Sequence, residues 1–351
     1  MTRLFDPLRL GALTVPNRIF MAPLTRCRAG EEHIANALMA EHYAQRASAG
    51  LLIAEATMAV EGNSAFWREP GIYGPAQVAG WKLVTDAVHA AGGRIFLQVW
   101  HGGRACHPLL NGGKQPVSAS ALAITNDTVH TPQGKQPYVV PRVLDDAEIP
   151  DIVASFRKAA ENAKAAGFDG VEIHGANGYL LDQFLQDSTN RRTDDYGGGI
   201  ENRARLMLEV TDACIAVWGA DRVGMHLAPR GDAHSMGDSD PAATFGYVAQ
   251  ELGKRRIAFI CARESVGPNR LGPQLKQAFG GVYIANEAHT RDSAEELLRS
   301  GEADAVAFGK AFIANPDLVR RFASDAPLNA PDPNTFYGQG PGGYLDYPSL
   351  P

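Results

Sequence analysis

The sequence has few cysteines, and their spacing does not suit a metal cluster. Its 351 residues include four, and no two of them form a CxxC pair; they are Cys27, Cys106, Cys214 and Cys261. We therefore interpret them as reduced thiols of a cytoplasmic protein and expect neither a zinc cage nor an iron–sulfur site.

Long hydrophobic runs and a surplus of positive charge are also missing. No apolar run approaches the roughly 18 residues that a membrane helix needs, and residues 1–7 lack the apolar stretch of a signal peptide. The 33 lysines and arginines are outnumbered by 39 aspartates and glutamates, which gives a net charge of −6. Because nucleic-acid binders usually carry a basic surplus, we expect neither nucleic acid nor a membrane as a partner.

Eight short apolar runs, rich in branched residues, alternate with alanine-rich amphipathic stretches. The runs are Ile19–Pro23, Leu51–Glu55, Arg94–Val99, Gly170–His174, Val223–Leu227, Ile257–Cys261, Val282–Asn286 and Ala305–Phe308. Their spacing leaves room for a strand, a helix and two short loops in each unit, which favours a parallel sheet. Eight such units with no other evident domain predict an α/β fold, a single (β/α)8 TIM barrel over residues 1–351.

Two segments do not fit this repeat. Residues 102–141 are rich in glycine and proline and weakly periodic, so we expect an inserted lid or cap after the third strand. The tail, residues 327–351, cannot form a regular helix, but its aromatic residues are numerous enough to pack on another part of the protein. They are Phe336, Tyr337, Tyr344 and Tyr347.

Polar residues follow the predicted strands at their carboxyl ends, where barrels of this kind place the active site. They are Thr25, Gln98, His101, His174, Asn177, Tyr179, His226, Asn286 and Lys310. Such a set is rich in hydrogen-bond donors and poor in carboxylates, so it suits a neutral heteroaromatic ring or a carbonyl oxygen better than a divalent metal. Gly309 and Lys310, after the last strand, fit the phosphate site that is usual in these barrels.

His174 and Asn177 lie three residues apart just past a strand, so both can point at one oxygen. Hydrogen bonds to developing charge contribute roughly 1.5–3 kcal/mol each. Tyr179 follows two residues later, and the ordinary tyrosine pKa of about 10 makes it a candidate proton donor.

Four segments form a specific combination, although each alone would be a weak signal. They are Ala22–Arg26, Gln98–Arg104, the cluster His174-x-x-Asn177-x-Tyr179, and Arg191 to Arg203 with its Tyr196-Gly197-Gly198. Together they resemble the old yellow enzyme family, the FMN-dependent ene-reductases among the NADH:flavin oxidoreductases. The likeness runs nearly end to end, from Leu4 to Pro348.

The resemblance implies bound FMN, which takes a hydride from NADPH or NADH and passes it to the β-carbon of a small activated alkene. Substrates would be α,β-unsaturated carbonyl, nitro or imide compounds, and the protein would be a monomer or a homodimer. His174 and Asn177 would hold the substrate oxygen, and Tyr179 would protonate the α-carbon from the opposite face. The implied cofactor-binding residues are Pro23, Leu24, Thr25, Ala56, Gln98, His226, Asn286, Gly309 and Lys310, and the implied substrate-pocket residues are Phe66, Trp100 and Tyr337.

Three positions depart from the family pattern. His226 stands where the family has an arginine facing flavin N1 and O2, and Arg230 is close enough in sequence to be a substitute. Lys310 stands where the family usually has an arginine that holds the phosphate. Lysine keeps the positive charge but cannot donate two parallel hydrogen bonds to the phosphate as a guanidinium does. Glu287 stands near the expected phosphate, where a small or neutral residue is common and a carboxylate would repel the anion unless it turned away.

Two other functions stay open at this point. His101, His174 and His226 lie near three strand ends and could bind a metal for hydrolysis, although no carboxylate in the sequence pattern bridges them. A flavin-binding or storage protein without catalytic activity is the second. A flavin spectrum or elemental analysis distinguishes a metal-dependent hydrolase from an ene-reductase. Turnover of NADPH with cyclohexenone or N-ethylmaleimide distinguishes an inactive flavin-binding protein from an ene-reductase.

We predict that His226 carries a proton when the flavin is reduced, because its strand position faces the negative charge that then develops. The measurement is the pH dependence of the flavin midpoint potential, from about pH 6 to pH 9, in the wild type and in His226→Ala. Loss of the imidazole should change the slope. Identical slopes would rule the prediction out.

Overall fold

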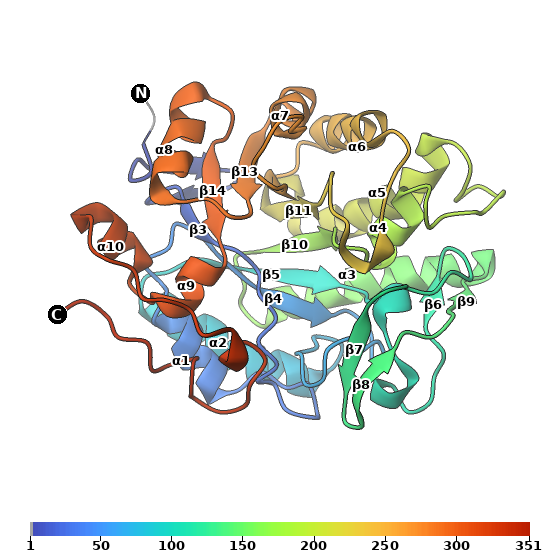
Figure 1. Ribbon diagram of the computed structural model, residues 1–351, viewed down its shortest axis with the longest axis horizontal. Coiled ribbons are helices and arrows are strands. Elements are labelled where there is room, and N and C mark those ends of the chain that lie inside the picture. The colour runs from blue at the N-terminus through green and yellow to red at the C-terminus, as the bar shows by residue number, and fades with distance from the viewer. Residues whose placement is uncertain (1–2) are drawn as a thin grey trace.

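Eight parallel strands close into a barrel in this computed structural model, which describes residues 3–351 (Figure 1). Each strand pairs with the next one along the chain, and the last pairs with the first. In chain order they are β3 (Ile19–Met21), β4 (Leu52–Met58), β5 (Ile95–Trp100), β10 (Gly170–Gly175), β11 (Val223–Leu227), β12 (Phe259–Arg263), β13 (Val282–Asn286) and β14 (Ala305–Phe308). The predicted (β/α)8 barrel is confirmed, with one strand overlapping each predicted run, although β4 and β12 extend past the predicted ends at Glu55 and Cys261.

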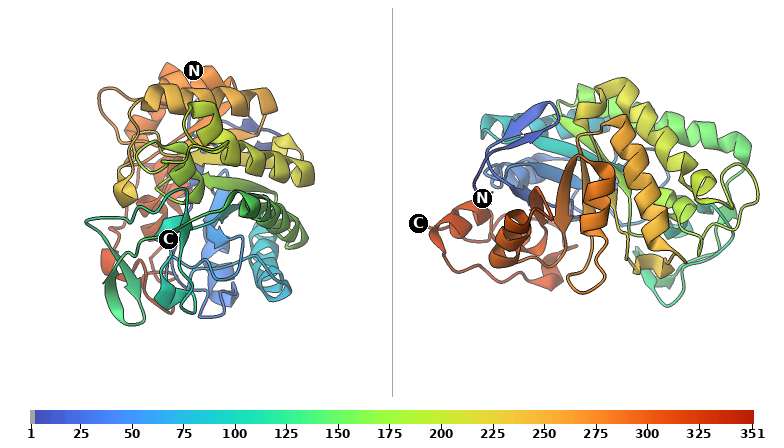
Figure 2. Two further views of the ribbon diagram at one scale, coloured as in Figure 1. Left: turned by 90° about the vertical axis from the view of Figure 1, so that its right-hand side faces the viewer. Right: turned by 90° about the horizontal axis from the view of Figure 1, so that it is seen from above.

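Helices surround the strands, as two further directions show (Figure 2). They are α1 (Ala37–Ala44), α2 (Pro75–Ala90), α3 (Ile149–Ala165), α4 (Leu180–Leu185), α5 (Ile200–Trp218), α6 (Pro241–Arg255), α7 (Gly272–Phe279), α8 (Arg291–Ser300), α9 (Lys310–Ala314) and α10 (Leu318–Ser324). Over residues 3–351, no helix is both long enough and apolar enough to cross a membrane.

Helix α3 shows how the sequence sets these elements. Asp145 and Glu148 form a capping box before it, in which each side chain accepts a hydrogen bond from the other residue's backbone N–H. Phe156 and Ala160 are fully buried on the face that packs toward the barrel. Gly167, with φ +90°, then turns the chain back toward strand β10.

The amino-terminal half of the barrel is filled with apolar side chains. Phe96 and Phe259 meet inside it with ring centroids 5.8 Å apart, and both are fully buried. Glycine is required at Gly170 and Gly224, because a Cβ there would lie 2.3 Å and 2.2 Å from these two rings. Strands β1 (Leu8–Leu10) and β2 (Leu13–Val15) form a hairpin whose apolar residues join this core.

The segment 102–141 is an insertion after β5 and contains more regular structure than its weak periodicity predicts. Strands β7 (Thr128–Thr131) and β8 (Gly134–Pro137) pair as an antiparallel hairpin. Strand β6 (Val117–Ser118) pairs with β9 (Arg142–Val143), which lies just beyond the insertion. The hairpin projects beside the barrel in Figure 1.

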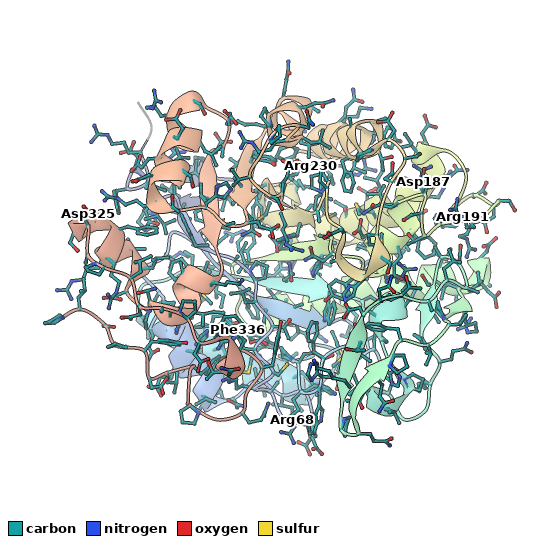
Figure 3. All side chains as sticks on the ribbon, viewed as in Figure 1. Arg68, Asp187, Arg191, Arg230, Asp325 and Phe336 are labelled. Carbon is teal, nitrogen blue, oxygen red and sulfur yellow. The ribbon has the colours of Figure 1, made fainter. Side chains whose placement is uncertain are left out.

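The carboxyl-terminal tail packs against the first two βα units. Tyr344 is fully buried and its ring stacks on His42, with centroids 3.8 Å apart. The Arg26 and Arg28 guanidinium groups lie 5.1 Å and 4.5 Å from the same ring, within cation–π range. The backbone carbonyl of Phe336 (Figure 3) accepts hydrogen bonds from both arginines at 2.9 Å. The tail therefore fixes the loop that follows β3.

We predict that Tyr344→Ala lowers the free energy of unfolding by about 3–5 kcal/mol, because it empties a buried aromatic site. The measurement is urea unfolding followed by circular dichroism. Leu328→Ala, at an exposed position of the same tail, should change stability by less than about 0.5 kcal/mol. Equal effects of the two substitutions would contradict the stabilising role of Tyr344.

Candidate active site

Two neighbouring cavities, each of about 520 Å³, lie at the carboxyl end of the barrel. The inner cavity is lined by the ends of β3, β5, β10, β11, β12, β13 and β14 and the residues that follow them. The outer cavity is lined by the hairpin β7–β8, by Phe66, Tyr138 and Tyr179, and by His234. Tyr337 of the tail lines both cavities. Volumes of this size are typical of small-molecule sites.

Most of the predicted site residues line one of these cavities. The inner cavity takes Pro23, Leu24, Gln98, His174, Asn177, His226, Asn286, Gly309 and Lys310. Phe66 and Tyr179 line the outer cavity. Among residues 3–351, the three predicted residues outside both linings are Thr25, which is half-buried, and Ala56 and Trp100, which are buried. Trp100 packs against Tyr179, with the two ring centroids 4.4 Å apart in an edge-to-face arrangement.

A sharp turn after β10 divides His174, Asn177 and Tyr179 between the cavities. Asn177 and Gly178 both have left-handed backbone conformations, with φ +57° and +76°. The turn leaves His174 and Asn177 facing the inner cavity, while Tyr179 faces the outer one. The rings of His174 and Tyr179 are 4.9 Å apart, so the two cavities meet at these side chains.

Burial keeps this pair of rings uncharged. It lowers the pKa of His174 well below its ordinary value, and the nearby His226, His234 and Arg263 add to the effect. It also raises the pKa of Tyr179 well above 10. The His174 Nδ1 atom is buried and has no hydrogen-bond partner among the described residues. A neutral imidazole and a neutral phenol therefore face the cavities as hydrogen-bonding groups.

His226 lies against a buried carboxylate that the sequence analysis did not identify. Glu172, fully buried on β10, accepts a hydrogen bond from Gln98 Nε2 at 2.7 Å, and the same Oε1 atom is 3.3 Å from His226 Nδ1. Within the described chain, Glu172 Oε2 and His226 Nε2 are buried without a partner. Of the three histidines considered for a metal, Glu172 contacts His226 alone within the described residues, so it does not bridge them.

The three histidines proposed for a hydrolytic metal do not converge. The rings of His174 and His226 are 5.6 Å apart. His101 is outside the inner-cavity lining; its Nδ1 accepts the Gly103 N–H, and burial lowers its pKa to about 3. Glu172, His226 and Cys261 do place one potential ligand atom each within 4.8 Å of one another. Since Gln98 already binds this carboxylate, we regard the group as a polar network in the floor of the cavity.

The hypothesis that Arg230 replaces the arginine expected at position 226 is wrong. Arg230 (Figure 3) donates to Glu264 Oε1 at 2.7 Å and to the Ser265 carbonyl, and it is not among the inner-cavity residues that the structure describes. The cavity contains a different arginine, Arg263, at the end of β12. Alternation along the strand could have identified Arg263 from the sequence. It lies two residues after Cys261, whose side chain belongs to the apolar core inside the barrel, and side chains two residues apart point to the same face of a strand.

Arg263 is tied to two neighbours. Its Nη1 donates to Asn177 Oδ1 at 3.0 Å, and its Nη2 donates to Glu287 Oε1 at 3.0 Å. Lys310 begins helix α9 at another part of the same cavity lining. The lining of the inner cavity therefore includes two permanent cations, Arg263 and Lys310, and the half-buried carboxylate of Glu287. Its other polar groups include amides and imidazoles.

Comparisons with known proteins cover almost the entire chain. Residues 3–329 match the family model of the NADH:flavin oxidoreductase / NADH oxidase family. A probable flavin mononucleotide-dependent alkene reductase of Leishmania infantum is 46% identical, with 99% of this chain and 97% of that protein covered. The 12-oxophytodienoate reductase 1 of Oryza sativa subsp. japonica is 45% identical, with 99% and 93% covered.

Solved structures of related enzymes have the same fold over nearly the full chain. Morphinone reductase in complex with tetrahydroNAD has a TM-score of 0.97 at 47% identity, covering 100% of this chain and 98% of that chain. The old yellow enzyme homologue from Zymomonas mobilis also has a TM-score of 0.97, at 46% identity, with 99% and 100% covered.

The residues present fit a bound flavin mononucleotide. The inner cavity offers amide and imidazole groups for a heteroaromatic ring, including the His226 Nε2 atom, which has no partner within the described residues, and the cation Lys310 for a phosphate. The chain therefore belongs to the NADH:flavin oxidoreductase / NADH oxidase family, and its relatives place it among the old yellow enzyme-type, FMN-dependent alkene reductases.

Proposed function

We propose that this protein reduces activated alkenes, namely α,β-unsaturated carbonyl, nitro and imide compounds, with NADPH or NADH as the hydride donor. The observation that carries the proposal is the turn after β10, which sets His174 and Asn177 toward the inner cavity and Tyr179 toward the outer one. When bound, FMN supplies the hydride chemistry, taking a hydride from the nicotinamide and giving it to the alkene β-carbon.

The inner cavity would hold the cofactor. Gln98, His226 and Asn286 line it with polar groups suited to the edge of the flavin, and Pro23 and Leu24 supply apolar contact. The Gln98 side chain is fixed by its bond to Glu172, so its carbonyl oxygen is left for an N–H donor. Asn286 is fixed in the same way, because its Nδ2 donates to the Ala307 carbonyl at 2.8 Å.

His174 and Asn177 would hold the oxygen atom that activates the alkene. Because Asn177 Oδ1 accepts from Arg263, its Nδ2 hydrogens are available for that oxygen. The neutral imidazole of His174 has one N–H to donate. Each bond would contribute roughly 1.5–3 kcal/mol as negative charge develops on the oxygen, which makes the β-carbon a better hydride acceptor.

Tyr179 would deliver the proton to the α-carbon. Tyr179 lines the outer cavity together with the aromatic residues Phe66, Tyr138 and Tyr337. The β7–β8 hairpin lines the same cavity with Val129 and His130, and we propose that it acts as the lid over the substrate. An apolar, covered site keeps the phenol neutral and limits competing proton transfer from water.

Tyr179→Phe should slow alkene reduction about 10²- to 10⁴-fold, since it removes the general acid but keeps the ring. Reduction of the bound flavin by NADPH should be unchanged. The measurement is anaerobic stopped-flow spectroscopy of each half-reaction, with 2-cyclohexenone as the alkene. Tyr247→Phe, on the remote helix α6, is the control. A wild-type rate of alkene reduction in Tyr179→Phe would contradict the assignment.

The pH dependence follows from the same groups. Tyr179 donates a proton only in its protonated form, and because burial raises its pKa well above 10, that form persists up to about pH 10. His174 has a lowered pKa and stays neutral over the same range. Alkene reduction by the preloaded enzyme should therefore not fall as the pH rises from about 6 to 9. A decline with a midpoint near pH 8 would show that another group is the acid.

We also propose a cytoplasmic monomer or homodimer. The four cysteines are buried free thiols in the described structure, which suits a reducing compartment.

A further inference from the structure

The inner cavity contains an arginine on β12, the strand next to β11, where the family pattern has its arginine. Strands β11 and β12 pair with His226 opposite Cys261. Residues two apart on a strand share a face, so Arg263 extends from the same inward row, one step nearer the carboxyl end. Its side chain is about one-third exposed and lines the inner cavity.

Glu287 gives this arginine a defined place in the cavity. The carboxylate follows β13 directly, in the loop that the family resemblance places near the cofactor phosphate, and Arg263 Nη2 holds it at 3.0 Å. A free carboxylate there would repel an anion, and the ion pair cancels that charge. Glu287 also has a left-handed backbone, with φ +99°, so the loop carries a strained conformation at this residue.

Arg263 has the donors to bind an additional anion. A guanidinium carries five N–H groups, and within the described residues two bonds from Arg263 to side chains account for only part of them. Lys310, the other permanent cation of the cavity, is a single point charge and lacks the planar fork that matches two phosphate oxygens.

The charge of the cavity also favours a role for Arg263 in binding an anion. The lining residues that share the cavity with Arg263 include the cation Lys310, the carboxylate Glu287 and the imidazoles of His174, His226 and His289. The carboxylate Glu172 lies in the floor, where it accepts from Gln98 and lies beside His226. Without Arg263, the permanent charges of the lining, Lys310 and Glu287, would cancel. A phosphate monoester brings about −1.5 to −2 charges at neutral pH, which that cavity would leave uncompensated.

We propose that Arg263 is a ligand of the FMN phosphate and, with Lys310, forms a two-cation clamp in which Arg263 also offsets the negative charge of Glu287. The inference rests on FMN as the cofactor of the proposed function, and it assigns to this chain a phosphate ligand on β12. The arginine fork that Lys310 does not provide is thus supplied by a different strand.

The test compares FMN with riboflavin, which lacks the phosphate. Each flavin is titrated into flavin-stripped full-length protein, and binding is followed by quenching of flavin fluorescence. The variants are Arg263→Met, Arg263→Lys and Glu287→Gln. Arg255→Met is the matched control, since Arg255 forms an ion pair with Asp212 on the outer surface of the barrel.

Arg263→Met should weaken FMN binding about tenfold or more and leave riboflavin binding unchanged, because a charge-assisted bond to phosphate is lost. Arg263→Lys should retain part of the FMN affinity, and Arg255→Met should retain all of it. Glu287→Gln should bind FMN more tightly than the wild type, since it removes a negative charge beside the phosphate.

Wild-type FMN affinity in Arg263→Met, or an equal loss for FMN and riboflavin, would overturn the inference. If Arg263→Met does not fold, the FMN titration of Glu287→Gln provides the test. Unchanged or weaker FMN binding in Glu287→Gln would also overturn the inference. Failure of the proposed function is a separate result. In that case the FMN-loaded wild type would not reduce cyclohexenone, whatever its affinity for FMN.

Discussion

Closure of the parallel barrel is the constraint on which the rest of the structure depends. Because all eight strands run in the same direction, their carboxyl ends meet at one mouth, and residues from distant parts of the chain share one site. The amino-terminal half is packed with buried rings such as Phe20, Phe96 and Phe259. Polar side chains therefore gather at the other end, where Gln98, Glu172 and His226 form the floor of the inner cavity.

The site combines fixed and unpaired polar groups. Gln98, Asn177 and Asn286 each have one end of the amide bound by a neighbour, which orients the other end. His174 Nδ1 and His226 Nε2 are buried and, in the part of the chain described, lack partners. Unsatisfied buried groups cost about 1–3 kcal/mol each, so the fold tolerates a local loss of stability where a ligand would satisfy them. This is the usual relation between a preorganised site and the stability of its scaffold.

Sequence reasoning located the strands and the strand-end residues because their signals are local. Branched apolar runs, a capping box at Asp145 and a glycine after several helices, such as Gly280 and Gly301, suffice for the βα units. It missed Glu172 because its role depends on register between strands, and it missed Arg263 because the predicted strand ended at Cys261, two residues before β12 ends. Glu172 meets Gln98 because β10 pairs with β5 at these two residues, and Arg263 reaches Asn177 across the mouth of the barrel. The β7–β8 hairpin and the stacking of Tyr344 on His42 were likewise hidden, since neither leaves a periodic pattern in the sequence.

The central claim is that one turn after β10 brings an imidazole, an amide and a phenol to a single substrate. A crystal structure of the FMN-loaded protein with bound 2-cyclohexenone tests it most directly. The account predicts the ketone oxygen within about 3 Å of nitrogen atoms of both His174 and Asn177, with the Tyr179 hydroxyl over the face of the ring turned away from the flavin. A ketone oxygen held by other residues, or a Tyr179 hydroxyl out of reach of the α-carbon, would contradict it.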